Sequence, residues 1–316
     1  MSTLHLLTPE LRAMQEEFPT MDMSPELLPV LREMIGSADI LGPVDLSSVK
    51  IEEIYVPGRN ANDPEIRCRK LSPETAKPNM PGILHIHGGG YIAGVPEMGD
   101  IALAPLVRAH GVTTLSVDYR LAPEHPHPAP LDDCYAALAW LHANAPDLEI
   151  DASRIAVTGE SAGGGLAAAL VQLAVSEGDY PIDYQHLLYP MLDDRTGSDA
   201  QPGCDTTGEF IWTRASNAFG WASYLGDAPR EAPHVPARAT DLTGLPRTWI
   251  GTATLDLFRN ENIEYAQRLM AHGVPTELIV YPDAGHGFQA ALDAPLTQRF
   301  WRDYHEAFAR GLGLTH

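Results

Sequence analysis

A serine, an aspartate and a histidine of this sequence stand in surroundings that suit nucleophilic catalysis. The serine, Ser161, is the centre of Gly159-Glu160-Ser161-Ala162-Gly163, which matches the pattern G-x-S-x-G. A β-branched run at 155–158 precedes it and an Ala/Leu-rich run at 166–170 follows it, so a strand is predicted to turn sharply into a helix. The flanking glycines leave room for the turn, and the backbone strain falls on Ser161. Its hydroxyl is then expected to project beyond the sheet, toward the N–H groups that begin the helix.

The pattern alone does not establish a catalytic serine, because a glycine-rich turn can hold a serine that is merely small. A base is predicted at His286, between two glycines in a loop after the last predicted strand. An acid is predicted at Asp256, after the preceding strand, although an aspartate there can also serve as a helix N-cap. Glu261 and Asp283 are the alternative acids, but Glu261 falls within a helical pattern and Asp283 is close to His286 along the chain.

The order Ser161, Asp256, His286 is the chain order of the triad in α/β-hydrolases. The run 85–91, His-Ile-His-Gly-Gly-Gly-Tyr, follows an apolar strand and can fold back to aim its amides at one point. We therefore predict an oxyanion hole made by the N–H groups of Gly88, Gly89 and Ala162.

The same run also contains a histidine pair, His85 and His87, with the H-x-H spacing of some metal sites. The sequence offers no further His/Asp cluster at a spacing that would complete such a site. No metal is therefore predicted.

Four motifs in this order resemble the hormone-sensitive-lipase family of esterases, the bacterial family IV. The resemblance runs from about residue 50 to the C-terminus and rests on residues 87–90 (HGGG), 118–126 (DYRLAPEHP), 159–164 (GESAGG) and 286–288 (HGF). It implies an α/β-hydrolase core with a helical cap, hydrolysis of carboxylic esters with short acyl chains, and no cofactor. Members of this family are often dimers, so the resemblance is compatible with a homodimer and leaves the oligomeric state open.

The sequence departs from the family pattern at two places. Glu160 stands where the family most often has aspartate, and we assign it a local structural role, with tuning of specificity as the alternative. The usual Asp-Pro-Leu-Arg-Asp-Glu acid motif is Asp-Leu-Phe-Arg-Asn-Glu at 256–261, so the loop loses its proline and keeps Asp256. In the stretch 118–126, Asp118, Arg120 and Glu124 are expected to form a charge network that holds the loop, without catalytic work.

Strand-like and helix-like segments alternate through the rest of the chain. Strands are predicted at about 50–56, 65–71, 82–87, 112–118, 154–158, 184–189, 247–251 and 277–281. Helices are predicted at about 97–110, 132–143, 162–177, 260–272 and 295–311. This alternation predicts an α/β fold with a mostly parallel eight-stranded sheet covered on both faces, and an antiparallel hairpin from the first two strands.

The α/β-hydrolase domain is assigned to residues 46–316, with a cap insertion expected within it at about 193–240, and residues 1–45 precede it. Residues 1–45 contain two helix starts, at Thr8 and Ser24, and form either a cap or a brace. The insertion at about 193–240 breaks the alternation and includes a helix near 213–225. Aromatic residues there and after the oxyanion run are the candidates for walls of a substrate pocket: Tyr91, Phe210, Trp212 and Trp221.

The amino-acid composition and the charge of the chain limit the classes of partner and the compartment that can be expected. The 316 residues include 21 Lys and Arg against 42 Asp and Glu, so the net charge is −21, which argues against nucleic acid and anionic membranes. The three cysteines show no metal or disulfide spacing, which fits a reducing compartment. No signal peptide or membrane-spanning run is recognised, and a cytoplasmic location is expected.

The expected function is hydrolysis of short- to medium-chain acyl esters of small molecules through a Ser-His-Asp acyl-enzyme mechanism. The same triad serves amidases and lactone hydrolases, so these remain alternatives. A non-catalytic binding protein of the same lineage is another alternative, although such proteins lack the base that His286 supplies.

Overall fold

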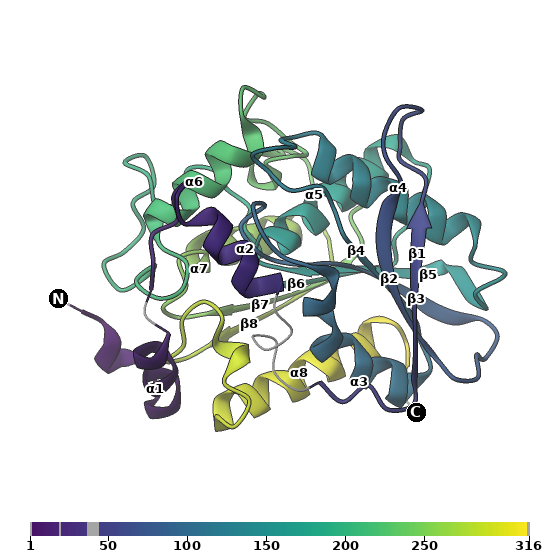
Figure 1. The fold of residues 1–316 in the computed structure, drawn as a ribbon, viewed down its shortest axis with the longest axis horizontal. Helices are drawn as coiled ribbons and strands as arrows, with labels where there is room; N and C mark the ends of the chain where they lie inside the picture. The colour runs from purple at the N-terminus through teal and green to yellow at the C-terminus, as the bar shows by residue number, and fades with distance from the viewer. Residues whose placement is uncertain (1, 19, 37–43, 315–316) are drawn as a thin grey trace.

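One eight-stranded sheet runs through the middle of the molecule (Figure 1). The computed structural model describes residues 2–18, 20–36 and 44–314. The strands are β1 (Val49–Val56), β2 (Ile66–Pro73), β3 (Met80–Ile86), β4 (Thr113–Val117), β5 (Ile150–Glu160), β6 (Tyr184–Leu188), β7 (Arg247–Ala253) and β8 (Thr276–Tyr281). Their order is β1-β2-β4-β3-β5-β6-β7-β8, and β3 to β8 are all parallel. β1 pairs antiparallel with β2, and β2 with β4, so the predicted fold class and edge hairpin are confirmed.

Helices cover both faces of this sheet. They are α1 (Pro9–Glu17), α2 (Leu28–Gly36), α3 (Asp100–His110), α4 (Ala129–Ala143), α5 (Ala162–Glu177), α6 (Arg214–Leu225), α7 (Arg259–Ala271) and α8 (Pro295–Gly311). α3 and α8 lie on one face, and α4, α5 and α7 on the other (Figure 1). Short 3-10 turns complete the set: η1 (Leu4–Leu6), η3 (Pro96–Gly99), η4 (Pro236–Arg238) and η5 (Phe288–Ala290).

The predicted elements match these bounds closely, with three differences. β5 begins at Ile150, four residues before its predicted start. The helix predicted at 97–110 is divided into η3 and α3. The second N-terminal helix, predicted from Ser24, begins only at Leu28, because residues 25–27 form a turn in which the N–H of Leu27 donates to Ser24 Oγ.

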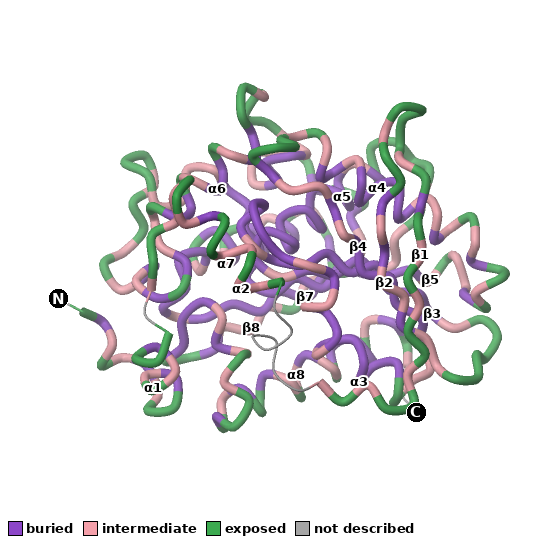
Figure 2. The backbone as a smooth tube through the Cα atoms, in the orientation of Figure 1, coloured by how far each residue is buried: buried purple, intermediate pink, exposed green. Residues whose placement is uncertain are grey.

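α5 occupies the centre of the fold. Twelve of its 16 residues are buried, so this helix has almost no solvent-facing side and its small Gly and Ala residues let it lie close to the sheet. Figure 2 shows the same burial running through the central strands and the helices beside them. A helix held this firmly gives the residue at its N-terminus a fixed position, and that residue is Ser161.

The N-terminal segment and the insertion contact each other. The N–H of Thr3 donates to Glu209, the N–H of Ile211 donates to Thr20 Oγ1, and the N–H of Met23 donates to a serine of α6. α1 begins as predicted, with Thr8 Oγ1 accepting from the N–H of Leu11. Part of the predicted N-terminal unit, at residues 1, 19 and 37–43, lies outside the described residues.

The charged residues of the stretch 118–126 do not bind one another as expected. Asp118 pairs with Arg67 of β2, Arg120 with Asp133 of α4, and Glu124 with Arg32 of α2. Arg32 also donates to the carbonyl oxygens of Ile92 and Ala122, at 2.8 and 2.9 Å. The stretch is therefore tied to three neighbouring elements, because each charge finds its partner on a different one.

None of the helices within the described residues combines the length and the apolar character needed to cross a membrane.

Candidate active site

Ser161 stands in a strained turn between β5 and α5, as the sequence predicted. Its φ of 56° and ψ of −121° place it in a region that residues with side chains rarely adopt, which costs roughly 1–3 kcal/mol. A Cβ atom at Gly163 would overlap the carbonyl oxygen of Ile86, so only glycine fits there. The strained residue is held by its own backbone, whose N–H donates to Leu188 O and whose carbonyl accepts from the N–H of Met191, each at 2.9 Å.

The three predicted triad residues meet at this turn. His286 Nε2 lies 3.0 Å from Ser161 Oγ, and His286 Nδ1 lies 2.8 Å from Asp256 Oδ2. A carboxylate can only accept, so Nδ1 carries the proton and Nε2 is left to accept from the serine hydroxyl. The exposed fractions of the residues are 5% for Ser161, 8% for His286 and 0% for Asp256, so water has little access to these contacts.

The two alternative acids have other partners. Glu261 is buried and its Oε1 accepts from the N–H of Leu192, at 2.7 Å. Burial raises the pKa of Glu261 well above its ordinary value. Asp283 is exposed, and its N–H donates to Thr254 Oγ1. Neither carboxylate contacts His286, so Asp256 is its acid partner.

Backbone hydrogen bonds join the acid loop to the histidine loop. The N–H of Leu255 donates to Ala284 O at 2.9 Å, and the second carboxylate oxygen of Asp256 accepts from the N–H of Phe258 at 2.8 Å. Arg259 Nη1 donates to Thr254 O at 2.7 Å. Arg259 therefore holds the loop in which Leu257 stands where the family motif has proline, a role that the sequence analysis did not assign.

The structure corrects one donor of the predicted oxyanion hole. The N–H of Gly88 points at Glu160 and donates to its Oε1 at 2.8 Å, so it is not available to a substrate oxygen. Among the described residues, the N–H groups of Gly89 and Gly90 have no such partner, and that of Ala162 is free as the first of a helix. Gly89 has a φ of 117°, which only glycine adopts readily, so the loop can fold back as expected.

The two histidines of the H-x-H run turn to different partners. His85 Nε2 lies 3.0 Å from Glu160 Oε2, whereas His87 stacks on Tyr119 with ring centroids 4.2 Å apart. Burial lowers the pKa of His87, which keeps its ring neutral. Within the described part of the chain, no group of three or more His, Cys, Asp or Glu side chains is arranged to hold a metal ion.

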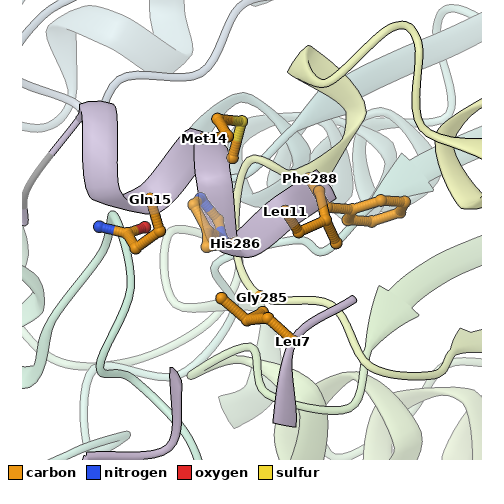
Figure 3. A pocket seen from close by; sticks show the side chains of 7 residues that line it. All are labelled: Leu7, Leu11, Met14, Gln15, Gly285, His286 and Phe288. Atoms are coloured by element: carbon orange, nitrogen blue, oxygen red, sulfur yellow. The ribbon is translucent and has the colours of Figure 1, made fainter. Parts of the chain in front are cut away.

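Helix α1 lies directly over the catalytic histidine. Leu11, Met14 and Gln15 of α1 face the loop that carries His286 and Phe288 (Figure 3). The cavity between them has a volume of about 10 Å³, close to the smallest that holds one water molecule. The N-terminal helix therefore shields the base from solvent.

The aromatic residues predicted to line a pocket divide into two pairs. Tyr91 and Trp221 are buried in the core, where Tyr91 stacks on Tyr224 and donates to Met191 O. The rings of Tyr91 and Trp221 also contact each other, with centroids 5.2 Å apart, so both residues make packing contacts, and their place in a pocket wall stays a prediction.

The other pair of aromatic residues lies against the catalytic loops. Phe210 packs beside Gly285, next to the catalytic histidine, and the Trp212 ring covers Gly90. The insertion therefore reaches both sides of the site through these two rings.

Comparison with known protein families agrees with this geometry. Residues 83–290 match the model of a family described as the alpha/beta hydrolase fold. The chain belongs to the α/β-hydrolase family. The matched segment of this α/β-hydrolase begins in β3 and includes the oxyanion run, Ser161, Asp256 and His286.

Relatives and solved structures place the chain among carboxylesterases of the hormone-sensitive-lipase type. Carboxylesterase NlhH of Mycobacterium tuberculosis is 35% identical over 292 residues, covering 89% of this chain and 88% of the relative. An arylesterase of Saccharolobus solfataricus is 34% identical over 242 residues, covering 75% of this chain and 76% of the relative. The structure of a bacterial heroin esterase shares 39% identity with a TM-score of 0.90, covering 98% of this chain and 99% of that one. This α/β-hydrolase is a serine carboxylic ester hydrolase.

Cys204, in the insertion, is predicted to be the most reactive thiol. Burial raises its pKa, but hydrogen bonds from Thr206 and Arg259 outweigh burial and hold the pKa at about 7. Burial raises the pKa of Cys68 to about 12, and that of the buried Cys134 also lies well above the ordinary value. Because the thiolate is the nucleophile, iodoacetamide should label Cys204 first, at a rate that rises as the pH passes through about 7.

Peptide mass spectrometry after brief alkylation measures this order, with Cys204→Ser as the control that removes the fast label. Preferential labelling of either buried cysteine in the folded protein would contradict the prediction.

Proposed function

We propose that this enzyme hydrolyses short- to medium-chain acyl esters of small molecules through an acyl-enzyme on Ser161. The observation that carries the proposal is the unbroken chain of contacts from Ser161 Oγ through His286 to Asp256, at 3.0 and 2.8 Å. A hydroxyl, an imidazole and a carboxylate in this order form a nucleophile, a general base and the group that orients the base.

The mechanism follows from the position of each group. Ser161 Oγ attacks the ester carbonyl while His286 Nε2 takes its proton, and the imidazolium is stabilised by Asp256. His286 then returns that proton to the departing alkoxide, so an alcohol leaves and the acyl group stays on the serine. A water molecule attacks the acyl-enzyme in the same way, which releases the carboxylic acid and restores the serine.

The negative charge on the carbonyl oxygen needs donors that are already in place. We assign this role to the N–H groups of Gly89, Gly90 and Ala162, with Gly90 taking the place first predicted for Gly88. Removing one donor of this kind typically costs about 10²–10³ in turnover, so the loop geometry is as important as the triad.

The limit on acyl chain length is predicted from what covers the site. α1, Phe210 and Trp212 lie over the catalytic loops, so the acyl site is expected to be bounded. Each buried methylene contributes about 0.8 kcal/mol, so the rate should rise along a series of acyl chains until the pocket is full and then fall.

The proposal is tested by hydrolysis of p-nitrophenyl acetate, butyrate, hexanoate, decanoate and palmitate, with the Ser161→Ala variant as the background. We expect kcat/KM to be greatest on one of the first three esters and much smaller on palmitate. Activity that is greatest on palmitate would overturn the proposed chain length. Matched p-nitroanilides and lactones, offered to the same preparation, would reveal an amidase or a lactone hydrolase instead.

We further propose a reducing, cytoplasmic location and a homodimer. The location is supported by the free cysteines at 68, 134 and 204. The dimer is supported by the open sheet edge at β8, which offers unpaired backbone groups to a second copy. Cell fractionation and size-exclusion chromatography with light scattering test these two statements separately.

A further inference from the structure

The side chain of Glu160 joins the nucleophile turn to the oxyanion loop. Glu160 ends β5 and immediately precedes Ser161, while its carboxylate reaches the loop that follows β3. Oε1 accepts from the N–H of Gly88 at 2.8 Å, and Oε2 lies 3.0 Å from His85 Nε2. One residue is thus bound through its backbone to the nucleophile and through its side chain to the loop that supplies the oxyanion donors.

The contacts continue across the sheet beyond Glu160. His85 Nδ1 lies 3.1 Å from Ser116 Oγ on β4, so the row of polar groups crosses the neighbouring strands β5, β3 and β4. His85 is 1% exposed and Ser116 is fully buried, which fixes the imidazole in one orientation. Burial alone raises the pKa of Glu160, but His85 and the N–H of Gly88 more than offset it, so the pKa lies below its ordinary value and the carboxylate is ionised at neutral pH.

The position of Gly88 decides where the next two amides point. Gly89 and Gly90 follow directly in the chain, and the far side of the turn is closed by the N–H of Ala93, which donates to Gly89 O at 3.0 Å. The loop is also held by the hydroxyl of Tyr119, which donates to His87 O at 3.0 Å, and by Glu160. The contact with Glu160 is the one that joins the glycine-rich run to the residue next to Ser161, so its loss removes a contact that sets the distance between this run and Ser161.

We infer that Glu160 is a positioning residue that holds the oxyanion loop in register with the nucleophile, and that His85 orients it. This inference rests on the proposed function, because it requires the N–H groups of Gly89 and Gly90 to receive the substrate oxygen. It gives a specific role to the residue at which the sequence departs from the usual aspartate. It also accounts for a buried histidine that the catalytic steps do not use.

The test compares two variants of similar side-chain volume, Glu160→Gln and Glu160→Met. Glutamine keeps an oxygen that can accept from Gly88, whereas methionine does not. We expect the glutamine variant to keep kcat within a few-fold of wild type, and the methionine variant to lose about ten- to a hundredfold in kcat with little change in KM. That loss is smaller than the 10²–10³ of a deleted donor, because the amides remain and are only misaimed.

The control is Glu97→Gln. Glu97 and Glu160 line the same 270 Å³ cavity between the sheet, α3 and α8, but Glu97 binds Arg67 and has no contact with the oxyanion loop. Its kcat should stay at the wild-type value. Rates are divided by the concentration of active sites titrated with paraoxon. A preparation with a smaller folded fraction then does not give a falsely low kcat.

A second readout separates positioning from folding. A trifluoromethyl ketone adds to the serine and forms an oxyanion, so its affinity for the methionine variant should fall by the same factor as kcat. Unchanged kcat per titrated site and unchanged ketone affinity would overturn the inference, even if the variant were less stable. If the methionine variant does not fold, Glu160→Ala is subjected to the same measurements. If the wild type hydrolyses no ester, it is the proposed function that fails.

Discussion

Replacing Ser161 with alanine is expected to lower kcat for p-nitrophenyl butyrate by about a million-fold. The hydroxyl oxygen is the atom that forms the acyl-enzyme. Without this hydroxyl, His286 has no proton to accept and no nucleophile attacks the ester carbonyl. The residual rate should still exceed that in water, since the oxyanion donors and the binding site remain. The measurement is an initial rate on a preparation whose fold is checked by circular dichroism and thermal unfolding.

The fold of this variant should remain intact. The hydrogen bonds that hold the strained turn are made by the backbone of residue 161, to Leu188 and Met191, and alanine keeps them. The matched control is Ser176→Ala, on the exposed surface near the end of the same helix, α5, which should leave both activity and stability unchanged. A folded Ser161→Ala protein with normal turnover would refute the nucleophile and the acyl-enzyme together.

Local sequence was sufficient to predict the nucleophile turn. The β-branched run favours a strand, the two glycines favour a tight turn, and the Ala/Leu-rich run favours a helix. A strand can pass into a helix over so few residues only through a strained residue. The ends of α5 and α8 also agree with prediction, because strong helical patterns bounded by polar or breaking residues leave little choice of limits. Ser161, Asp256 and His286 each follow a different strand of the parallel sheet. Parallel strands bring their carboxyl ends to one edge, so the three side chains can meet there.

The sequence did not reveal contacts between groups that lie far apart in the chain. The N–H of Gly88 was predicted to bind substrate, but Glu160, 72 positions away, accepts its hydrogen bond. The hydroxyl of Tyr91 donates to Met191 O, 100 positions away, a contact that the motif around Tyr91 does not reveal. A glycine-rich motif shows that a backbone can turn, and it does not show which of its amides a neighbouring side chain will reach first.

The charged stretch 118–126 shows that ion-pair partners are also difficult to predict from sequence. Asp118, Arg120 and Glu124 have complementary charges at short spacing, which favoured a network among themselves. Each instead pairs with a residue of another element: Asp118 with Arg67, Arg120 with Asp133 and Glu124 with Arg32. Sequence proximity predicts ion pairs well on a helix, where residues three or four apart are neighbours, and poorly on a loop.

Replacing Asp256 with asparagine is expected to lower kcat by about 10⁴-fold while the enzyme stays folded. The asparagine oxygen can still accept from the N–H of Phe258, but its NH₂ group then faces His286 Nδ1, where the carboxylate now lies at 2.8 Å. Two donors cannot face each other, so Nδ1 must give up its proton and become the acceptor. The proton then sits on Nε2, which can no longer take one from Ser161.

Asp283→Asn is the matched control, since it removes the same charge from the histidine loop itself without touching the imidazole. Asp283 is exposed and lies three residues before His286, so a loss that came only from the electrostatic field of a nearby carboxylate would appear in both variants. A loss confined to Asp256→Asn identifies the direct contact of residue 256 with His286 Nδ1, which sets the position of the ring proton, as the cause. If Asp256→Asn retained wild-type kcat and Asp283→Asn did not, the acid of the triad would have to be reassigned to Asp283. The buried contact of Asp256 with Nδ1 would then be structural, and the exposed carboxylate of Asp283 would be the one that stabilises the charged imidazole.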